Sequence, residues 1–599
     1  MAYDTVIANG LVFDGTGAPG IRRHLGIRDG LVVVSSDVPL DVTGCPRVVD
    51  AEGCWVTPGF LDMHTHYDAE LIAAPALGES LRHGVTTVTI GSCSISAVLS
   101  DPLDCADMFT RVESVPREQV LPLLTARKTW STPAEYRAFI DSHPLGPNVT
   151  SFLGHSDLRA RVLGLGRAVD PAYRPTEDEL GSMERWLSEA LDAGFLGLSS
   201  MTNPWDKLDG DRFRSKQLPS VYAGWREYRR LHRVLRRRGR ILQSAPNLVN
   251  KLNSFLFLAE SAGWGFRAPL RTTLITMADP VATPGIHRAL AAMTDFVNRR
   301  IGADLRWQTL PVPFEVYADG LDLVVFEEFG AGQAALHLLG DARRELLADA
   351  EYRRQFRKDY EARWSPRVWQ RDFSQAFIVA CPDESIVGQS ISQVATSRGE
   401  HPVDTFLDLV VAHGRALRWR TLIANHRPRE VGWMMRQSSA LIGFADSGAH
   451  IRNMAFYSFP LRLLAHVRDA ERLGKPVMPI EKAIWRLTGE LADWLNVDAG
   501  HLRKGDRADL VVIDPTALDA RLAGYHEAPM EGMGGLVRMV NRSDGVVRTV
   551  LVNGRVAFDA GGFAPSLGRE GGFGQFLAAG EKARAGGSSQ ALLASAAAA

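Results

Sequence analysis

Short strand-like segments occupy both ends of this chain. Three of them precede residue 58, and in each one β-branched residues alternate with polar ones between Gly, Asp and Pro: TVIANGLVFDG, HLGIRDGLVVVS and PRVVDAEGCWVTPG. Residues 506–514 and 546–558 repeat this pattern, the second with an Asn-Gly pair typical of a tight hairpin. Two β-rich ends around a long middle predict one small β-sandwich domain formed by 1–57 plus 499–575.

The middle of the chain, 58–498, alternates apolar strands with amphipathic helices. Residues 178–193 carry apolar side chains at helical spacing, and Gly194 ends that pattern just before a strand at 195–200. Further strands are expected at 84–91, 239–245, 271–277, 305–311 and 439–448. Alternation of this kind predicts a parallel sheet, and its length favours a (β/α)8 barrel. The predicted fold class is therefore α/β, a TIM-like barrel with a β-sandwich built from both chain ends.

Two segments depart from this alternation. The sequence becomes long, charged and helical around 320–370, which predicts a helical insertion in the barrel. Residues 576–599 are assigned to a tail of low complexity, because the end of the chain is rich in Gly, Ala and Ser.

The composition argues against a nucleic-acid-binding, a disulfide-rich or a membrane-spanning protein. The 599 residues include 68 Lys and Arg against 69 Asp and Glu, so no basic excess is available to offset nucleic-acid phosphates. Five scattered cysteines do not indicate a disulfide framework. The N-terminus lacks a signal-peptide pattern, and no run approaches the ~18 apolar residues of a membrane span. We expect a cytoplasmic protein acting on a small molecule, without nucleic-acid or membrane partners; homo-oligomerisation is left open.

The strongest chemical signal is a pair of histidines in PGFLDMHTHYD. His64 and His66 are separated by one residue after an apolar run. On a strand, such residues point to the same side, so both imidazoles could bind one metal ion at the catalytic rim of the barrel. The alternative is two surface histidines in a turn.

This stretch resembles the metal-dependent amidohydrolase superfamily, whose first barrel strand ends in a His-x-His pair. Further segments are similar to the branch of the N-acyl-D-amino-acid deacylases, or D-aminoacylases. They occur in the order of that family: HGVTTVTIGSCSIS (83–96), FLGHSDLR (152–159), GFLGLSS (194–200), IGFADSGAH (442–450) and the closing helix and strand at 487–515. The resemblance covers residues 1 to about 560.

The resemblance implies a zinc site made by His64, His66, Cys93 and Asp446. Zn²⁺ accepts imidazole, thiolate and carboxylate ligands and activates water near neutral pH. Asp446 would also be catalytic, moving a proton from this water to the leaving amine. The implied reaction is hydrolysis of the C–N amide bond of an N-acyl amino acid, the D form included, by metal-activated hydroxide. For Cys93 the alternative is a small buried residue at a strand end.

One departure from the family concerns the fifth and sixth strands, which each end in a metal-binding histidine in the D-aminoacylases. Here Gln243, Ser244 and Thr276 stand near those positions. Amides and hydroxyls bind zinc less well than imidazole. The sequence therefore predicts one zinc ion and leaves a second ion, the substrate and its stereochemistry open.

Four residues near the expected rim are candidates for substrate binding: His155, Arg159, Gln243 and His450. His155 could instead be a structural histidine that caps a loop, and Arg159 and His450 could be solvated.

Three hypotheses remain after this reading of the sequence. The first is the zinc-dependent amidohydrolase. The second keeps a mononuclear site but acts on a cyclic amide, a lactam or an ester. The third is a non-catalytic barrel used for binding, although retention of four convergent ligands argues against it.

Overall fold

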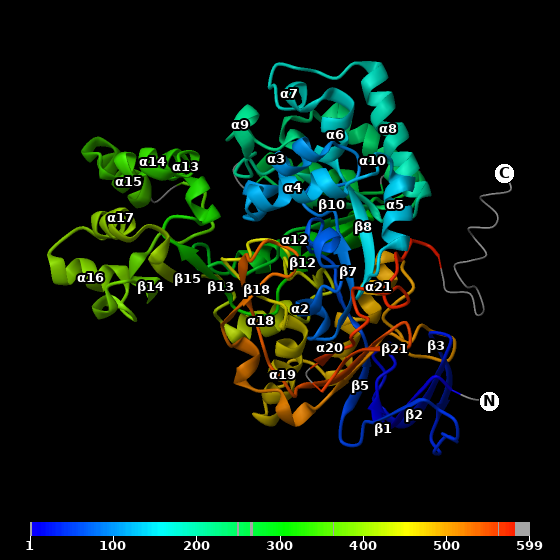
Figure 1. The fold of residues 1–599 in the computed structure, drawn as a ribbon. Coiled ribbons are helices and arrows are strands. Elements are labelled where there is room, and N and C mark those ends of the chain that lie inside the picture. Colours follow the sequence, from blue (N-terminus) through cyan, green and yellow to red (C-terminus); the bar gives the residue numbers. More distant parts are fainter. Residues whose placement is uncertain (1–2, 248–250, 264–266, 363–364, 561, 582–599) are drawn as a thin grey trace.

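The structure is a computed structural model that describes residues 3–247, 251–263, 267–362, 365–560 and 562–581, without the side chains of 251–254. Figure 1 shows a central barrel, a sheet that combines the two ends of the chain, and a separate lobe beside the barrel. No helix within these described ranges is long and apolar enough to cross a membrane. The cytoplasmic location stays a prediction.

The central sheet has eight parallel strands, which confirms the predicted TIM-like barrel. In spatial order they are β6 (Phe60–Asp62), β7 (Val85–Ile90), β8 (Asn148–Gly154), β9 (Gly197–Met201), β10 (Ile241–Ala245), β11 (Arg271–Leu274), β12 (Asp304–Thr309) and β16 (Ala440–Ile442). The barrel closes where the segments after β6 and β16 meet: the Asp446 N–H donates to the His64 carbonyl at 3.1 Å, and the His66 N–H donates to the Ser447 carbonyl at 2.8 Å. This seam places the His-x-His pair beside Asp446.

Helices pack around the barrel strands. They include α3 (Pro102–Glu113), α4 (Arg117–Arg127), α5 (Pro133–Ser142), α6 (His155–Leu163), α8 (Glu177–Asp192), α10 (Trp225–Arg237), α11 (Lys251–Ser261), α12 (Ile286–Ile301), α18 (Pro428–Met434), α19 (Phe459–Arg472), α20 (Ile480–Leu487) and α21 (Gly489–Leu495). In α8, Thr176 and Glu179 form a capping box, and Met183 and Leu187 face the core. Gly194 follows with φ 95°, a conformation that suits glycine and turns the chain into β9.

The two ends of the chain meet in one sheet, as predicted. Strands β1 (Thr5–Val12), β2 (Ile21–Arg28), β3 (Leu31–Ser36), β4 (Arg47–Asp50) and β5 (Trp55–Pro58) come from the N-terminal part; β17 (Leu510–Ile513), β20 (Val547–Val552), β21 (Arg555–Asp559) and β22 (Gly562–Phe563) come from the C-terminal part. The two parts join where β5 pairs with β17 in antiparallel register. A core that includes Ile7, Leu25, Val56 and Leu510 forms beneath this join.

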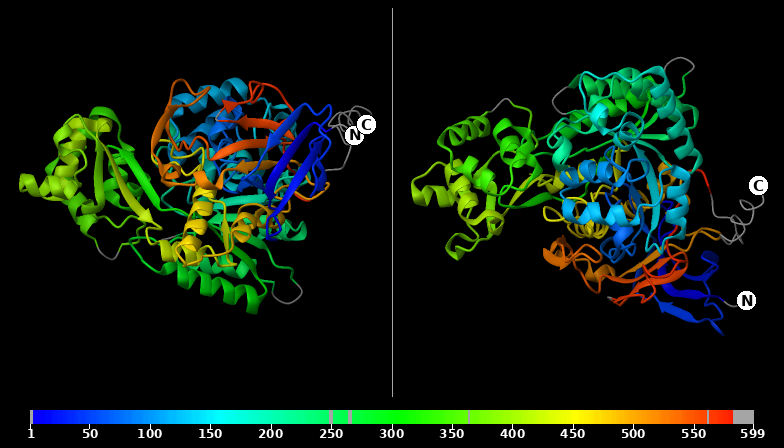
Figure 2. Two further views of the ribbon diagram at one scale, coloured as in Figure 1. Left: turned by 90° about the horizontal axis from the view of Figure 1, so that it is seen from below. Right: turned by 45° about the horizontal axis from the view of Figure 1, so that its top comes forward.

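A lobe of residues 314–424 lies to one side of the barrel in all views (Figures 1 and 2). Its elements are β13 (Phe314–Asp319), α13 (Gly330–His337), α14 (Gly340–Ala348), α15 (Ala350–Glu361), β14 (Ala376–Ala380), α16 (Ile391–Arg398), α17 (Pro402–His413) and β15 (Arg418–Ala424). The lobe has its own aromatic core, with Phe326, Trp369 and Trp419. It contains the helices expected around 320–370 together with a three-stranded sheet. The division of the chain into domains stays a prediction.

The last described residues pack against the barrel rather than leaving it. The Val149 N–H donates to the Gln575 carbonyl at 2.9 Å, and the Leu577 N–H donates to the Val149 carbonyl at 2.8 Å. Phe576 and Leu577 are buried. The sequence predicts a tail at 576–599, but the apolar residues 576–579 form part of the packed structure.

Candidate metal centre

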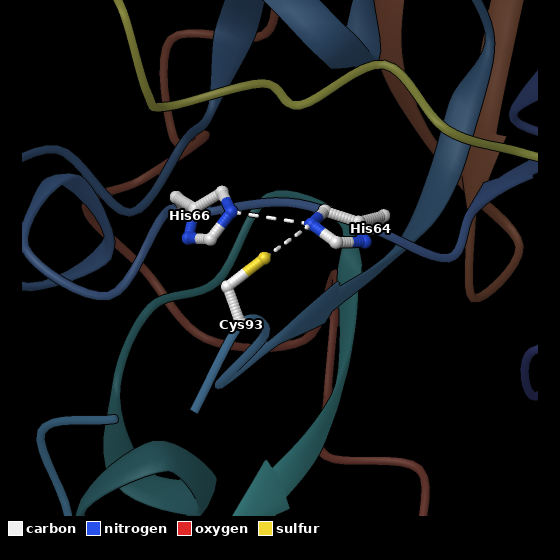
Figure 3. Close-up of side chains that lie close together, drawn as sticks. All are labelled: His64, His66 and Cys93. Carbon is white, nitrogen blue, oxygen red and sulfur yellow. Dashed lines mark hydrogen bonds between the residues drawn. The ribbon is translucent and has the colours of Figure 1, made fainter. Parts of the chain in front are cut away.

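The four predicted metal ligands come together at the carboxyl ends of the barrel strands. His64 and His66 follow β6, Cys93 follows β7, and Asp446 follows β16. In Figure 3 the two imidazole rings and the Cys93 thiol point toward one another. The carboxyl-terminal face is where TIM barrels carry their active sites.

The ligand atoms of His64, His66 and Cys93 all lie within 4.8 Å of one another, and two of the three separations are close to those of a tetrahedral zinc site. His64 Nε2 lies 3.2 Å from His66 Nε2 and 3.3 Å from Cys93 Sγ. Asp446 Oδ1 lies 3.1 Å from His66 Nε2 and 3.6 Å from His64 Nε2. Tetrahedral Zn–N and Zn–S bonds separate neighbouring ligand atoms by about 3.3 to 3.6 Å. The two imidazoles and the thiol could therefore hold one ion, with the carboxylate of Asp446 beside it.

The second nitrogen of each histidine ring has its own partner. His64 Nδ1 lies 2.6 Å from Gln308 Oε1, and His66 Nδ1 lies 3.0 Å from Glu113 Oε1. An oxygen at Nδ1 favours the tautomer with its proton there, which leaves Nε2 free to bind a metal. Neither Gln308 nor Glu113 is predicted from the sequence. Gln308 lies within the recognised strand at 305–311 but carries no motif, and Glu113 ends a helix whose position the sequence alone does not fix.

Burial and neighbouring charges determine the protonation of the ligands. Burial lowers the pKa of His64 to about 4 and raises the pKa of Cys93 to about 12. Burial also acts against the charged form of His66, but the carboxylates of Glu113 and Asp446 raise its pKa well above the usual value. Burial opposes ionisation of Asp446, but the hydrogen bond and charge of His66 hold its pKa well below the usual range. Metal binding therefore requires protons to leave His66 and Cys93.

Gln243 and Thr276 stand near the positions of the family's other metal-binding histidines. The side chains of both form hydrogen bonds with other residues of the protein. Gln243 Oε1 accepts from the Cys93 N–H at 3.2 Å, and its Nε2 lies 3.4 Å from Ser92 Oγ. The Thr276 hydroxyl donates to the Gln308 carbonyl at 2.8 Å. Both residues thus support segments that carry or orient the candidate ligands.

His155 and Arg159 lie together in a buried network. His155 Nε2 is 2.7 Å from Glu227 Oε1, and Arg159 pairs with the other oxygen of this carboxylate. The network ties α6 to α10, and both side chains are almost fully buried. Their role in substrate binding stays a prediction, and the structure gives each side chain a protein partner.

His450 lies on the accessible side of the centre. Its side chain and that of Asp446 are partly exposed, whereas His64 and His66 are buried. The His450 N–H donates to the Glu113 carbonyl at 2.5 Å, and its ring Nδ1 lies 3.3 Å from Ser114 Oγ. His450 and Asp446 both lie on the segment that follows β16.

The chain is similar in sequence and in structure to several known proteins. No family model matches the chain. It is 53% identical to an uncharacterized protein of Mycobacterium tuberculosis over 98% of this chain and 96% of that protein. It is 33% identical to the N-acyl-D-glutamate deacylase of Alcaligenes xylosoxydans over 33% of this chain and 37% of that enzyme.

A solved structure matches nearly the whole chain. It is the N-acyl-D-glutamate deacylase of Bordetella bronchiseptica, complexed with zinc and a phosphonate inhibitor that mimics the tetrahedral intermediate. The match has a TM-score of 0.63 and 22% identity and covers 97% of this chain and 100% of that one. At this identity the likeness shows a shared fold.

Proposed function

Because the chain belongs to the metal-dependent amidohydrolase superfamily, in the branch of the N-acyl-D-amino-acid deacylases, we propose that it is a zinc-dependent hydrolase of the C–N amide bond of an N-acyl amino acid. The observation that carries this proposal is the convergence of His64, His66 and Cys93, whose ligand atoms all lie within 4.8 Å of one another. A relative that matches a third of the chain acts on N-acyl-D-glutamate, which favours a D substrate here.

The residues of the site divide the work of hydrolysis. His64, His66 and Cys93 would hold the ion, and zinc bound there supplies Lewis acidity and activates water near neutral pH. The Asp446 carboxylate lies beside the proposed ligands and could accept a proton from the attacking water and pass it to the leaving amine. The Asp446 side chain is partly exposed, whereas those of His64 and His66 are buried.

We propose one zinc ion rather than two. Gln243 and Thr276 carry no imidazole, and their polar atoms already bind Cys93 and Gln308. Amide and hydroxyl oxygens that serve such bonds are weak competitors for zinc. Gln243 and His450 remain candidates for contact with the substrate, because both are close to the proposed ligands.

The test is hydrolysis by the zinc-loaded protein of a panel of N-acyl-D- and N-acyl-L-amino acids, with cyclic amides and esters beside them. We expect amine release from an acylated amino acid, loss of activity after chelation, and recovery with Zn²⁺. Activity that persists after complete metal removal would contradict the proposal. Hydrolysis of only the cyclic amides or esters would move the function to the second hypothesis.

A further inference from the structure

The carboxyl-terminal end of α3 contacts segments from both sides of the barrel seam. The Glu113 side chain, the last of α3, lies 3.0 Å from Nδ1 of His66, which follows the first barrel strand. The Glu113 carbonyl accepts from the N–H of His450, which follows the last strand. The next residue, Ser114, lies 3.3 Å from the His450 ring. One helix end thus contacts both ligand-bearing loops.

The Glu113 carboxylate faces the Nδ1 atom of the His66 ring. His66 Nδ1 and Glu113 Oε1 lie 3.0 Å apart as an ion pair without hydrogen-bond geometry, and neither atom has a hydrogen-bond partner among the described residues. Both side chains are buried. A carboxylate at Nδ1 fixes the ring orientation, leaves Nε2 as the metal-facing atom and makes it a stronger ligand. In the dry interior this electrostatic effect is larger than in water.

The loop on the other side of the seam contains two non-glycine residues with a left-handed backbone. Asp446 and His450 have φ values of 57° and 47°, a left-handed conformation that residues with side chains rarely adopt. The bonds from Glu113 and Ser114 hold the far end of this turn. The helix itself is fixed: Asp101 caps its start, and the buried carboxylate of Asp107 binds Arg117.

We propose that Glu113 is a positioning residue of the metal centre, acting through His66 with its carboxylate and through the 446–450 loop with its carbonyl. This inference rests on the proposed function, because it presupposes that the site binds a metal. Glu113 does not itself reach the reacting atoms; it sets the orientation and basicity of His66 and the position of Asp446.

The experiment measures the Zn²⁺ dissociation constant by competition with a chromogenic chelator for the wild type, Glu113→Gln and Glu113→Ala. Glu113→Ala should weaken zinc binding by about 10- to 100-fold. Glu113→Gln should lie between it and the wild type, because the amide oxygen can still accept from Nδ1. The matched control is Glu118→Ala, which removes an exposed glutamate five residues away and should bind zinc like the wild type.

Each outcome decides the proposal. A folded Glu113→Ala variant with wild-type zinc affinity would overturn it. If that variant does not fold, Glu113→Gln decides, and wild-type affinity there would also overturn it. Absorption spectra of the Co²⁺-loaded proteins add a readout of ligand geometry, and we expect a changed spectrum for Glu113→Ala alone. A wild-type protein that binds no zinc would contradict the proposed function instead.

Discussion

The side-chain carbonyl of Gln243 accepts a hydrogen bond from the backbone N–H of Cys93 at 3.2 Å. The resemblance to the D-aminoacylases leads one to expect a histidine ligand near this position of the fifth strand. Here the side chain instead holds the peptide group of another candidate ligand, whose backbone has φ 51°. Gln243 thus supports the segment that carries Cys93, one of the proposed ligands.

Gln243→Met should therefore destabilise the protein and weaken its zinc binding. The substitution leaves the buried Cys93 N–H without its acceptor, which costs about 1 to 3 kcal/mol. Thermal unfolding and zinc titration measure the two effects. Gln355→Met, which changes an exposed glutamine on α15, should alter neither. Equal results for the two variants would contradict the supporting role of Gln243.

Asp446→Asn should abolish turnover while the protein still binds zinc. The amide cannot accept the proton of the attacking water, and loss of a general base costs about 10²- to 10⁴-fold in rate. The measurement is kcat of the zinc-loaded variant with its metal content determined in the same sample. Turnover within a few-fold of wild type would remove Asp446 from the mechanism. Loss of turnover with the metal retained would exclude the non-catalytic barrel.

Zinc affinity should rise with pH. His64, with a pKa of about 4, is already neutral at pH 7, whereas His66 and Cys93, whose pKa values are raised, still carry protons. These protons compete with the ion, so higher pH favours binding, with about two protons released near neutrality. Calorimetry at pH 7 in buffers of different ionisation enthalpy counts the protons. Binding that releases none would contradict this charge distribution.

Phe576→Ala should lower the stability of the barrel. Phe576 is buried, packs against Phe195 in a tilted arrangement with 5.8 Å between ring centroids, and lies beneath the guanidinium of Arg137. Truncating a buried phenylalanine costs about 3 to 5 kcal/mol. The midpoint of urea unfolding measures the loss, with Phe296→Ala as control because Phe296 is 59% exposed. Similar midpoints for both variants would show that the C-terminal segment does not stabilise the barrel.

The barrel and the His64–His66 pair could be predicted because their signals are local, whereas Cys93 and Asp446 are candidate ligands through the resemblance to the D-aminoacylases. The alternation of strands and helices is visible in the sequence itself. A recognisable strand directly precedes each of the four residues His64, His66, Cys93 and Asp446. Parallel strands bring their carboxyl ends to one face, so the fold class alone implies that such residues meet.

The supporting residues could not be predicted, because their contacts depend on the packing of distant elements. Glu113 reaches His66 only because α3 ends beside the seam, and Gln308 reaches His64 across 244 positions of sequence. His155 and Arg159 stand in a motif at a strand end, but Glu227 from α10 engages both in the interior.

The most direct test of the central claim is a crystal structure of the zinc-loaded protein with anomalous data collected at the zinc edge. We expect one anomalous peak per chain, about 2.0 to 2.3 Å from His64 Nε2, His66 Nε2 and Cys93 Sγ. The absence of a peak between these atoms would contradict the proposed metal centre. A second peak beside Gln243 and Thr276 would contradict the mononuclear site.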